Sequence, residues 1–241
     1  MTSTKNGGWK VIMKRELSAY FSSPIAYIVC CIFLVFSGFW LFFAFFAMRR
    51  ADLRRFFESL PIFFSLFIPA LTMRVFSEEK RSGSFETLLT LPVSTVDVVT
   101  GKYLATLASA LLMLLPTLSY ALTCSMFGTP DAGPIIGGYL GSVLLCAAFT
   151  AIGLYASSRT KDQIVAFLVP LAICISLSLV NQLAFLLPGT IVSFVSFISA
   201  SSHFESISRG IVDTRDILYF ISLTAVFFVL TVQSIENARK G

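Results

Sequence analysis

Residues 78–103 read EEKRSGSFETLLTLPVSTVDVVTGKY, and they decide how the rest of the chain is organised. The segment opens with four charged residues in succession, is interrupted by Gly83 and reaches Pro92 after a short apolar stretch. A bilayer does not accept such a segment as a crossing, because charges are costly in its hydrocarbon core. Long apolar runs flank it on both sides. We therefore expect a short helix held at a membrane surface, where another protein can contact it.

The short helix within this segment has its own local signals. Ser84 is placed as the N-cap residue, and Glu86 falls in the first turn, where the helix dipole favours an anion. Phe85 and Leu88 form an apolar patch, and Pro92 ends the helix. A helix of two turns is unstable alone in water, so it needs the membrane surface or a docked protein to hold it.

The composition of the whole chain indicates a membrane protein. Of its 241 residues, 56% are hydrophobic and 13% charged, whereas a soluble domain carries roughly 25% charged residues. A single core cannot hide this much apolar surface from water. The net charge of +5 is spread over the ends of apolar runs, so it does not point to nucleic acid. All five cysteines lie in apolar runs without metal-ligand spacing, and no metal site is expected.

The hydropathy pattern predicts an all-α membrane protein with a single transmembrane domain over residues 1–241 and six spans. We place the spans at 25–47, 56–76, 103–127, 134–157, 163–187 and 217–235. An amphipathic helix at 8–23 precedes them and is expected to lie flat in the headgroup layer, because it combines an aromatic face with basic residues. The segment 77–100 connects the second and third spans on the cytoplasmic side.

The region 188–212 is ambiguous. It is apolar enough to enter the membrane, but its apolar part is short and follows a Pro-Gly break. We expect a re-entrant or interfacial hairpin on the outer side, with a seventh span as the alternative. In a six-span arrangement, 12 of the 18 Lys and Arg residues fall on the side that holds both termini. This asymmetry favours an inner-membrane protein with both termini in the cytoplasm.

Motifs for energy conversion and catalysis are absent from the sequence. It contains no P-loop, HExxH, CxxC or GxSxG motif, so we propose no catalytic residue and do not expect ATP to bind this chain. The single histidine, His203, lies near several serines, and an intramembrane hydrolase using them is an alternative to a packing role. Ionisable residues are scarce within the spans, which argues against a self-powered transporter. Asn181 and Gln182, the main strongly polar residues there, would line a substrate path or bond between helices.

The pattern ExxxGSxExLLxxPVS, which begins at Glu79 and is followed by Gly101-Lys102 at the next span, resembles the signature of type-2 ATP-binding-cassette (ABC) transporter permeases. Ser84 stands where threonine is usual in that family. Residues 203–220, HFESISRGIVDTRDILYF, are similar to its gliding-motility-associated and copper-processing permeases. The resemblance covers nearly the whole chain. It implies six spans, a flat N-terminal helix, a cytoplasmic coupling helix between spans two and three, and an outer re-entrant hairpin between spans five and six.

The resemblance also implies a function and partners. It makes the chain the membrane subunit of an ABC exporter, paired with a second permease that is the same or a related chain. Two cytoplasmic ATP-binding subunits would hold ATP and Mg²⁺, and an extracytoplasmic accessory protein is a further expected partner. The cargo that suits an apolar path is lipid-linked or amphipathic. A membrane scaffold that recruits a cytoplasmic partner without transport is the alternative.

The resemblance further implies which residues couple the permease to the ATPase. They are Glu79, Gly83, Phe85, Glu86, Leu88 and Pro92. Phe85 and Leu88 are expected to insert into a groove of the ATPase. The two glutamates are expected to meet basic groups there, so that closure of the ATPases pushes on the spans.

Overall fold

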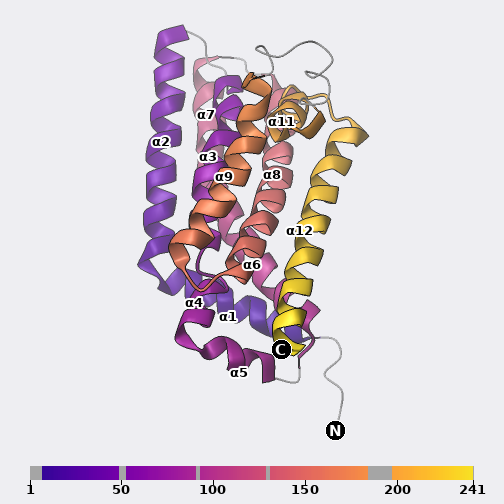
Figure 1. The fold of residues 1–241 in the computed structure, drawn as a ribbon. Coiled ribbons are helices and arrows are strands. Elements are labelled where there is room, and N and C mark those ends of the chain that lie inside the picture. Colours follow the sequence, from indigo (N-terminus) through magenta and orange to yellow (C-terminus); the bar gives the residue numbers. More distant parts are fainter. Residues whose placement is uncertain (1–6, 49–52, 91–92, 129–130, 184–196, 241) are drawn as a thin grey trace.

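The computed structural model of the chain describes residues 7–48, 53–90, 93–128, 131–183 and 197–240, and every regular element within these ranges is helical. The elements are α1 (Gly8–Ser22), α2 (Pro24–Met48), α3 (Arg54–Thr72), α4 (Ser77–Ser82), α5 (Ser84–Thr90), α6 (Thr95–Leu114), the 3₁₀ turn η1 (Leu115–Thr117), α7 (Leu118–Phe127), α8 (Ala132–Arg159), α9 (Gln163–Leu183), α11 (Ala200–Ser208) and α12 (Thr214–Lys240). Figure 1 shows a bundle of long helices with short helices at both ends.

Six helical stretches in the described residues are long and apolar enough to cross a bilayer. They are Pro24–Phe43, Arg54–Ser82, Thr95–Phe127, Ala132–Arg159, Gln163–Val180 and Thr214–Lys240. The prediction of an all-α membrane protein with six crossing helices is therefore confirmed.

The third of these stretches begins at Thr95, well before residue 103 where we placed its start. Ser94 explains the difference. Its hydroxyl accepts a hydrogen bond from the Asp97 backbone N–H at 3.1 Å and donates one to the Asp97 carboxylate. This reciprocal capping fixes the start of α6. The last residues of the predicted segment 77–100, from Thr95 onward, therefore belong to α6.

Hydrogen bonds from neighbouring helices reach the backbone beside two prolines of the long helices. Pro116 falls in η1, and Tyr139 of α8 donates to the adjacent Thr117 carbonyl at 2.8 Å. Ser178 of α9 donates to the carbonyl of Pro61, within α3, at 3.2 Å. These contacts are those of closely packed helices.

Helix α8 lies at the centre of the bundle and contacts α3, α6, α9, α11 and α12. Two of its glycines allow the closest approaches. A Cβ at Gly137 would lie 2.2 Å from the Ile207 carbonyl oxygen of α11, and one at Gly153 would lie 2.1 Å from Thr72 Oγ1 of α3. Any larger residue would push these helices apart. The small residues of the fourth span therefore serve packing within the chain.

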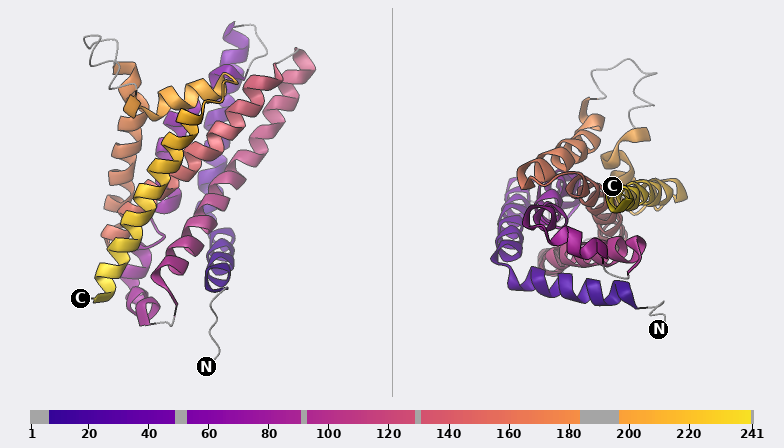
Figure 2. Two further views of the ribbon diagram at one scale, coloured as in Figure 1. Left: turned by 90° about the vertical axis from the view of Figure 1, so that its right-hand side faces the viewer. Right: turned by 60° about the horizontal axis from the view of Figure 1, so that its bottom comes forward.

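The short helices divide between the two ends of the bundle. Helices α1, α4 and α5 lie at one end together with the C-terminal end of α12, and we call this the α5 end (Figure 1). Helix α1 runs across it, roughly perpendicular to the long helices (Figure 2). Helix α11 lies at the opposite end, which we call the α11 end.

One face of α1 packs against α6, and the place of α1 in the headgroup layer stays a prediction. The Ile12 side chain lies so close to α6 that a Cβ at Gly101 would come within 2.9 Å of it. Farther along α1, the Tyr20 hydroxyl donates to the Leu71 carbonyl at 2.9 Å. An amphipathic stripe buries itself against whichever apolar surface is nearest, and here that surface is the protein's own.

The predicted hairpin at 188–212 lies partly outside the described residues. Its described part contains α11, which has nine residues and packs against α8, α3, α9 and α12. At 1.5 Å per residue such a helix is about 14 Å long, about half of a ~30 Å hydrocarbon core. The part of this region that the structure describes therefore contains no crossing helix, and the re-entrant geometry stays a prediction.

Candidate functional site

The segment that the sequence singled out folds into α4 and α5, joined at Gly83, and we call residues 77–90 the elbow (Figure 1). Gly83 has a φ of 78°, in the left-handed region that glycine adopts without strain. It ends α4 and lets α5 leave in a new direction. Ser84 is the first residue of α5, and its hydroxyl bonds back to the Glu79 carbonyl at 3.4 Å. The prediction of Ser84 as the N-cap of α5 is therefore wrong.

The apolar side of the elbow is buried in the bundle. Phe85 is 7% exposed and Leu88 is 8% exposed. They share a cluster with residues of the α3–α4 junction, α6, α8 and α12, namely Val75, Phe76, Val98, Val99, Leu154 and Ile235. The expectation that Phe85 and Leu88 insert into a groove of a partner is therefore wrong, because the end of the chain's own bundle already supplies that groove. Their burial holds α5 in place.

The opposite side of the elbow is polar and faces outward. Glu78, Arg81 and Glu86 are exposed there. A cavity of about 280 Å³ adjoins this side, and its lining includes Glu86, Arg159 at the end of α8 and Lys161 in the turn that follows. Charges of both signs thus surround a concave surface at the α5 end. The sequence predicted Glu86 as a residue that contacts a partner. Arg159 and Lys161 entered the sequence analysis only among the basic residues that indicate membrane orientation.

A buried lysine joins the elbow to two other helices. Lys102 of α6 is 1% exposed, and its ammonium group donates to Glu79 Oε1 at 2.8 Å and to Glu16 Oε1 at 3.1 Å. Its third acceptor is the Val75 carbonyl oxygen at 3.0 Å, in the junction between α3 and α4. A buried ammonium group is tolerable only when its charge is paired and its donors are bonded. All three donors of Lys102 are used, so α1, α4 and α6 meet at one point.

Glu79 accordingly faces inward. We expected it to meet basic groups on a partner, but it pairs with Lys102 and lies 3.4 Å from Arg15 Nη2. That expectation is wrong, since the cation that neutralises Glu79 belongs to the same chain. A sequence cannot show which of two adjacent glutamates turns inward when both precede a glycine break.

The carboxylate of Glu16 is held in its charged form by the same cluster. Burial by itself would raise the pKa of Glu16, but attraction to Lys102 and bonds from Arg15 and Lys102 outweigh it and lower the pKa below 4.5. Arg15 Nη2 lies 2.8 Å from Glu16 Oε1. The four residues Arg15, Glu16, Glu79 and Lys102 form one network, which we call the lysine network.

The glycine before Lys102 makes the lysine network possible. A Cβ at Gly101 would lie 2.8 Å from the Trp9 carbonyl oxygen, so only glycine lets α1 approach α6 this closely. This approach brings Glu16 within reach of Lys102, which stands 86 residues later in the sequence. The Gly-Lys pair was visible in the sequence, but nothing there connected it to Glu16 or Arg15.

The remaining predicted site residues are not part of this assembly. Pro92 lies outside the described residues. Asn181 and Gln182 belong to the last turn of α9, and their side chains also lie outside what the structure describes. That turn is at the α11 end, far from the elbow (Figure 1).

The arrangement around His203 favours a packing role over hydrolysis. Its Nδ1 lies 2.6 Å from Asp216 Oδ1, and its Nε2 lies 3.0 Å from the Phe197 carbonyl oxygen. The ring stacks on Tyr219 with centroids 4.2 Å apart. Neither ring nitrogen is left to activate a serine hydroxyl. Among the described residues, no group of three or more His, Cys, Asp or Glu side chains is placed to hold a metal ion.

Comparison with known proteins identifies the family of the chain. A family model described as ABC-2 family transporter protein matches residues 22–238. The match runs from the end of α1 almost to the end of α12 and so includes the elbow and Lys102. A search of the curated proteins gave no match.

Proposed function

The chain belongs to the ABC-2 family of transporter proteins, as a membrane permease subunit of an ABC transporter, and we propose that separate cytoplasmic ATPase subunits drive export through it. ATP and Mg²⁺ would bind those partners. The proposed cargo is amphipathic or lipid-linked, because the spans are rich in apolar and hydroxyl side chains and poor in charges.

The observation that carries this proposal is the union of the elbow with α1 and α6 at Lys102. Charge-assisted hydrogen bonds are shorter and stronger than neutral ones, and this ammonium group makes two of them to carboxylates on different helices. The apolar cluster under Phe85 and Leu88 adds α8 and α12 to the same body. A push on the elbow would therefore displace the inner ends of several spans together.

The proposed contact with the ATPase is the polar side of the elbow. Glu86 and Gly83 are exposed next to Arg159 and Lys161, so charges of both signs are available to a partner. Glu79, Phe85 and Leu88 act as positioning residues, which hold this surface against the bundle. Pro92 keeps its proposed place in the coupling segment.

The wider assembly follows from the same placement. We propose two ATPase subunits at the α5 end and a second permease, the same or a related chain, beside the spans. Both termini would be cytoplasmic in the inner membrane, since α1 and the C-terminal end of α12 lie at the α5 end (Figure 1). Asn181 and Gln182 would line the outer part of the path. Residues 203–220 support the gliding-motility-associated and copper-processing subgroup and, with it, an extracytoplasmic accessory protein.

The experiment that tests the coupling surface is a charge reversal. Glu86→Lys places a cation beside Arg159 and Lys161 and is expected to weaken co-purification of the cognate ATPase. Asp131→Lys is the matched control, because Asp131 is an exposed acid whose side chain makes no capping hydrogen bond at the start of α8. Equal recovery of the ATPase with both variants would show that the elbow is not the surface that contacts the ATPase.

Transport and static recruitment are separated by turnover. In vesicles that contain the permease and its ATPase, an exporter shows ATP hydrolysis that rises with cargo lipid, and Glu86→Lys lowers it. A membrane scaffold uses the same exposed surface to recruit a partner, but its ATP hydrolysis does not respond to any lipid added.

A further inference from the structure

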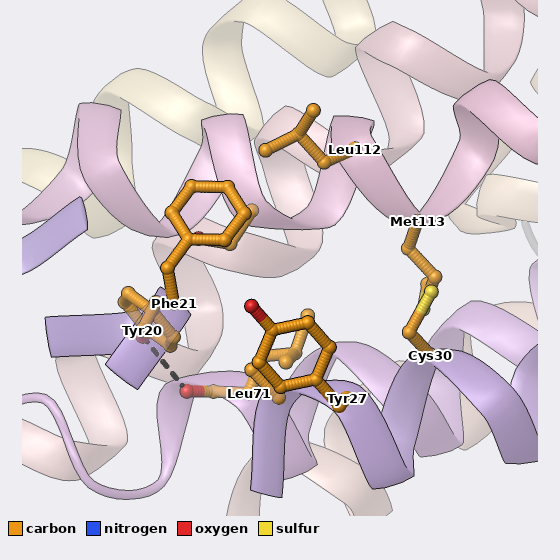
Figure 3. Close-up of a pocket in the computed structure, with 9 residues that line it drawn as sticks. Tyr20, Phe21, Tyr27, Cys30, Leu71, Leu112 and Met113 are labelled. Atoms are coloured by element: carbon orange, nitrogen blue, oxygen red, sulfur yellow. Dashed lines mark hydrogen bonds between the residues drawn. The ribbon is translucent and has the colours of Figure 1, made fainter. Parts of the chain in front are cut away.

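A cavity at the junction of α1 and α2 is not used by the coupling surface. It measures about 230 Å³ and lies between the end of α1, the start of α2, α3 and α6. Figure 3 shows Phe21 and Leu112 along one side and Tyr27, Cys30 and Met113 along the other. Its walls are almost entirely apolar side chains.

Two polar groups in the walls, the hydroxyls of Tyr20 and Ser109, are already bonded within the protein. The Tyr20 hydroxyl donates to the Leu71 carbonyl at 2.9 Å and lies 3.2 Å from Thr106 Oγ1 (Figure 3). The Ser109 hydroxyl donates to the Ala105 carbonyl at 3.0 Å. The donor hydrogens of both hydroxyls are already used, so a polar ligand would gain little here for the hydration that it loses. The volume equals about eight waters at ~30 Å³ each, which suits a length of hydrocarbon chain.

The mouth of the cavity has the residues of a membrane interface. Tyr27 is 55% exposed and Phe21 is 50% exposed. Aromatic residues, tyrosine and tryptophan above all, concentrate where hydrocarbon meets headgroups, because each ring has an apolar body and tyrosine adds a polar tip. The lining residues place the cavity where the end of α1 meets the first spanning helix, and α1 crosses the α5 end of the bundle (Figure 2). Its mouth is thus at the depth where acyl chains begin.

Positive charge lies next to this mouth. Lys10, Lys14 and Phe21 are exposed and recur at spacings that place them on one face of α1. Lys14 and Phe21 are two helical turns apart, which is about 10 Å along the axis. A phosphate at Lys14 and a chain that passes Phe21 therefore fit one phospholipid, and zwitterionic lipid would gain less from the lysines.

We propose that this cavity holds an acyl chain of an anionic phospholipid whose phosphate lies at Lys14. The chain fills the space between α1, α2 and α6, and so holds α1 in the position that the lysine network needs. The proposal depends on the membrane location of the chain and not on transport.

The test is photo-crosslinking of the full chain in lipid nanodiscs. The probe is phosphatidylglycerol with a diazirine within one acyl chain, and adducts are mapped by peptide mass spectrometry. We expect adducts at Cys30, Leu112 and Met113 to exceed several-fold those at Val226, which is 54% exposed on α12. Bulk lipid reaches this α12 position, so an excess measures a held chain.

Two matched variants sharpen the result. Ser109→Leu fills the cavity and is expected to abolish the excess. Ser176→Leu is the control, because Ser176 also donates to the carbonyl four residues earlier but lies on an exposed face of α9. Ala26→Leu fills the cavity from α2 and replaces Ser109→Leu if that variant does not fold.

Three results would overturn the assignment. They are the absence of an excess over α12, an excess that survives both filled variants, and equal adduct yields with phosphatidylglycerol and phosphatidylcholine. With Lys14→Gln, the preference for phosphatidylglycerol is expected to disappear while the protein stays folded.

Discussion

Each end of the bundle contains a largely buried contact between an acidic and a basic side chain, but the two pairs connect the chain in different ways. At the α5 end, Lys102 bonds to Glu16, 86 residues away, and to Glu79, 23 residues away. At the α11 end, His203 pairs with Asp216, only 13 residues away, at 2.6 Å. The first pair ties together three helices that are distant in sequence, and the second closes a corner between neighbouring helices.

The two pairs differ in the sequence separation that they span. The contacts of Lys102 join several distant elements, whereas the contact of His203 joins two neighbouring helices. Lys102 uses all three of its donors across α1, α4 and the α3–α4 junction, so none of these elements can move without breaking a charged contact. The His203 ring is held by Asp216 and stacked on Tyr219, and both residues belong to α12. The α5 end is therefore the end that can pass a displacement into the bundle.

The largest effect is expected from Lys102→Met. Removing the ammonium group leaves the carboxylates of Glu16 and Glu79 with the exposed guanidinium of Arg15 as their nearest cation, and breaking a buried ion pair from one side costs about 3–5 kcal/mol. The free energy of unfolding in detergent, measured by denaturant titration, checks this. The triple variant Lys102→Met with Glu16→Gln and Glu79→Gln removes the orphaned charges and is expected to recover part of the loss. A single variant as stable as the parent chain would mean that the network is not paired in the membrane.

The next effect is expected from Phe85→Ala, which truncates a core side chain at the α5 end. Phenylalanine truncations in cores cost about 3–5 kcal/mol, and the lower end applies here because the ring is 7% exposed. Phe39→Ala is the control, since its ring is 68% exposed. The same titration measures both. If Phe85→Ala abolished ATPase binding without any loss of stability, the ring would belong to the interface and the original sequence prediction would be restored.

The sequence predicted the overall fold more completely than it predicted the contacts at the α5 end. Six long apolar runs leave few alternatives, because each must hide its backbone polar groups as a helix in lipid. The start of a helix was predicted less accurately where its capping residues were not recognised, as at Ser94 and Asp97. The Ser-x-x-Asp spacing there matches a capping box and would have moved the start of α6 to Thr95.

The sequence alone could not show which surface each amphipathic face packs against. Phe85 and Leu88 lie on one side of α5, and that stripe fits a partner, a membrane or the chain itself equally well. The choice depends on the surface that α6, α8 and α12 present, which is a property of the packed bundle. Lys102 was counted as a topology charge for the same reason, since a partner 86 residues away leaves no local pattern.

A smaller effect is expected at the α11 end from His203→Leu. Asp216 would lose the ring that bonds to its Oδ1, while its Oδ2 already has no hydrogen-bond partner. Leaving a buried acceptor unsatisfied costs about 1–3 kcal/mol, less than the loss expected for Lys102→Met. Denaturant titration compares the two directly, and His203→Gln is expected to restore part of the loss through an amide donor. A cost equal to that of Lys102→Met would mean that the Lys102 contacts and the His203–Asp216 contact do not differ in their importance for the fold.

The smallest effect is the response of α1 to acid. Because the folded pKa of Glu16 is lowered, its contribution to docking is complete above the ordinary value of 4.5 and is lost as the pH falls through the folded pKa. Trp9 on α1 and Trp40 are the two tryptophans of the chain, so Trp40→Phe leaves Trp9 as the sole reporter.

We expect acrylamide quenching of Trp9 fluorescence to stay constant from neutral pH down to 4.5 and to rise below it, as protonated Glu16 releases Lys102. In a Glu16→Gln background the quenching is expected to be high already at neutral pH and to change little with acid, because no carboxylate is left to titrate. The His203–Asp216 corner is too far from α1 to contribute, and His203→Gln is expected to leave the Trp9 profile unchanged. Quenching that rises equally in the Glu16→Gln variant would place the acid response in another group and detach α1 from the lysine network.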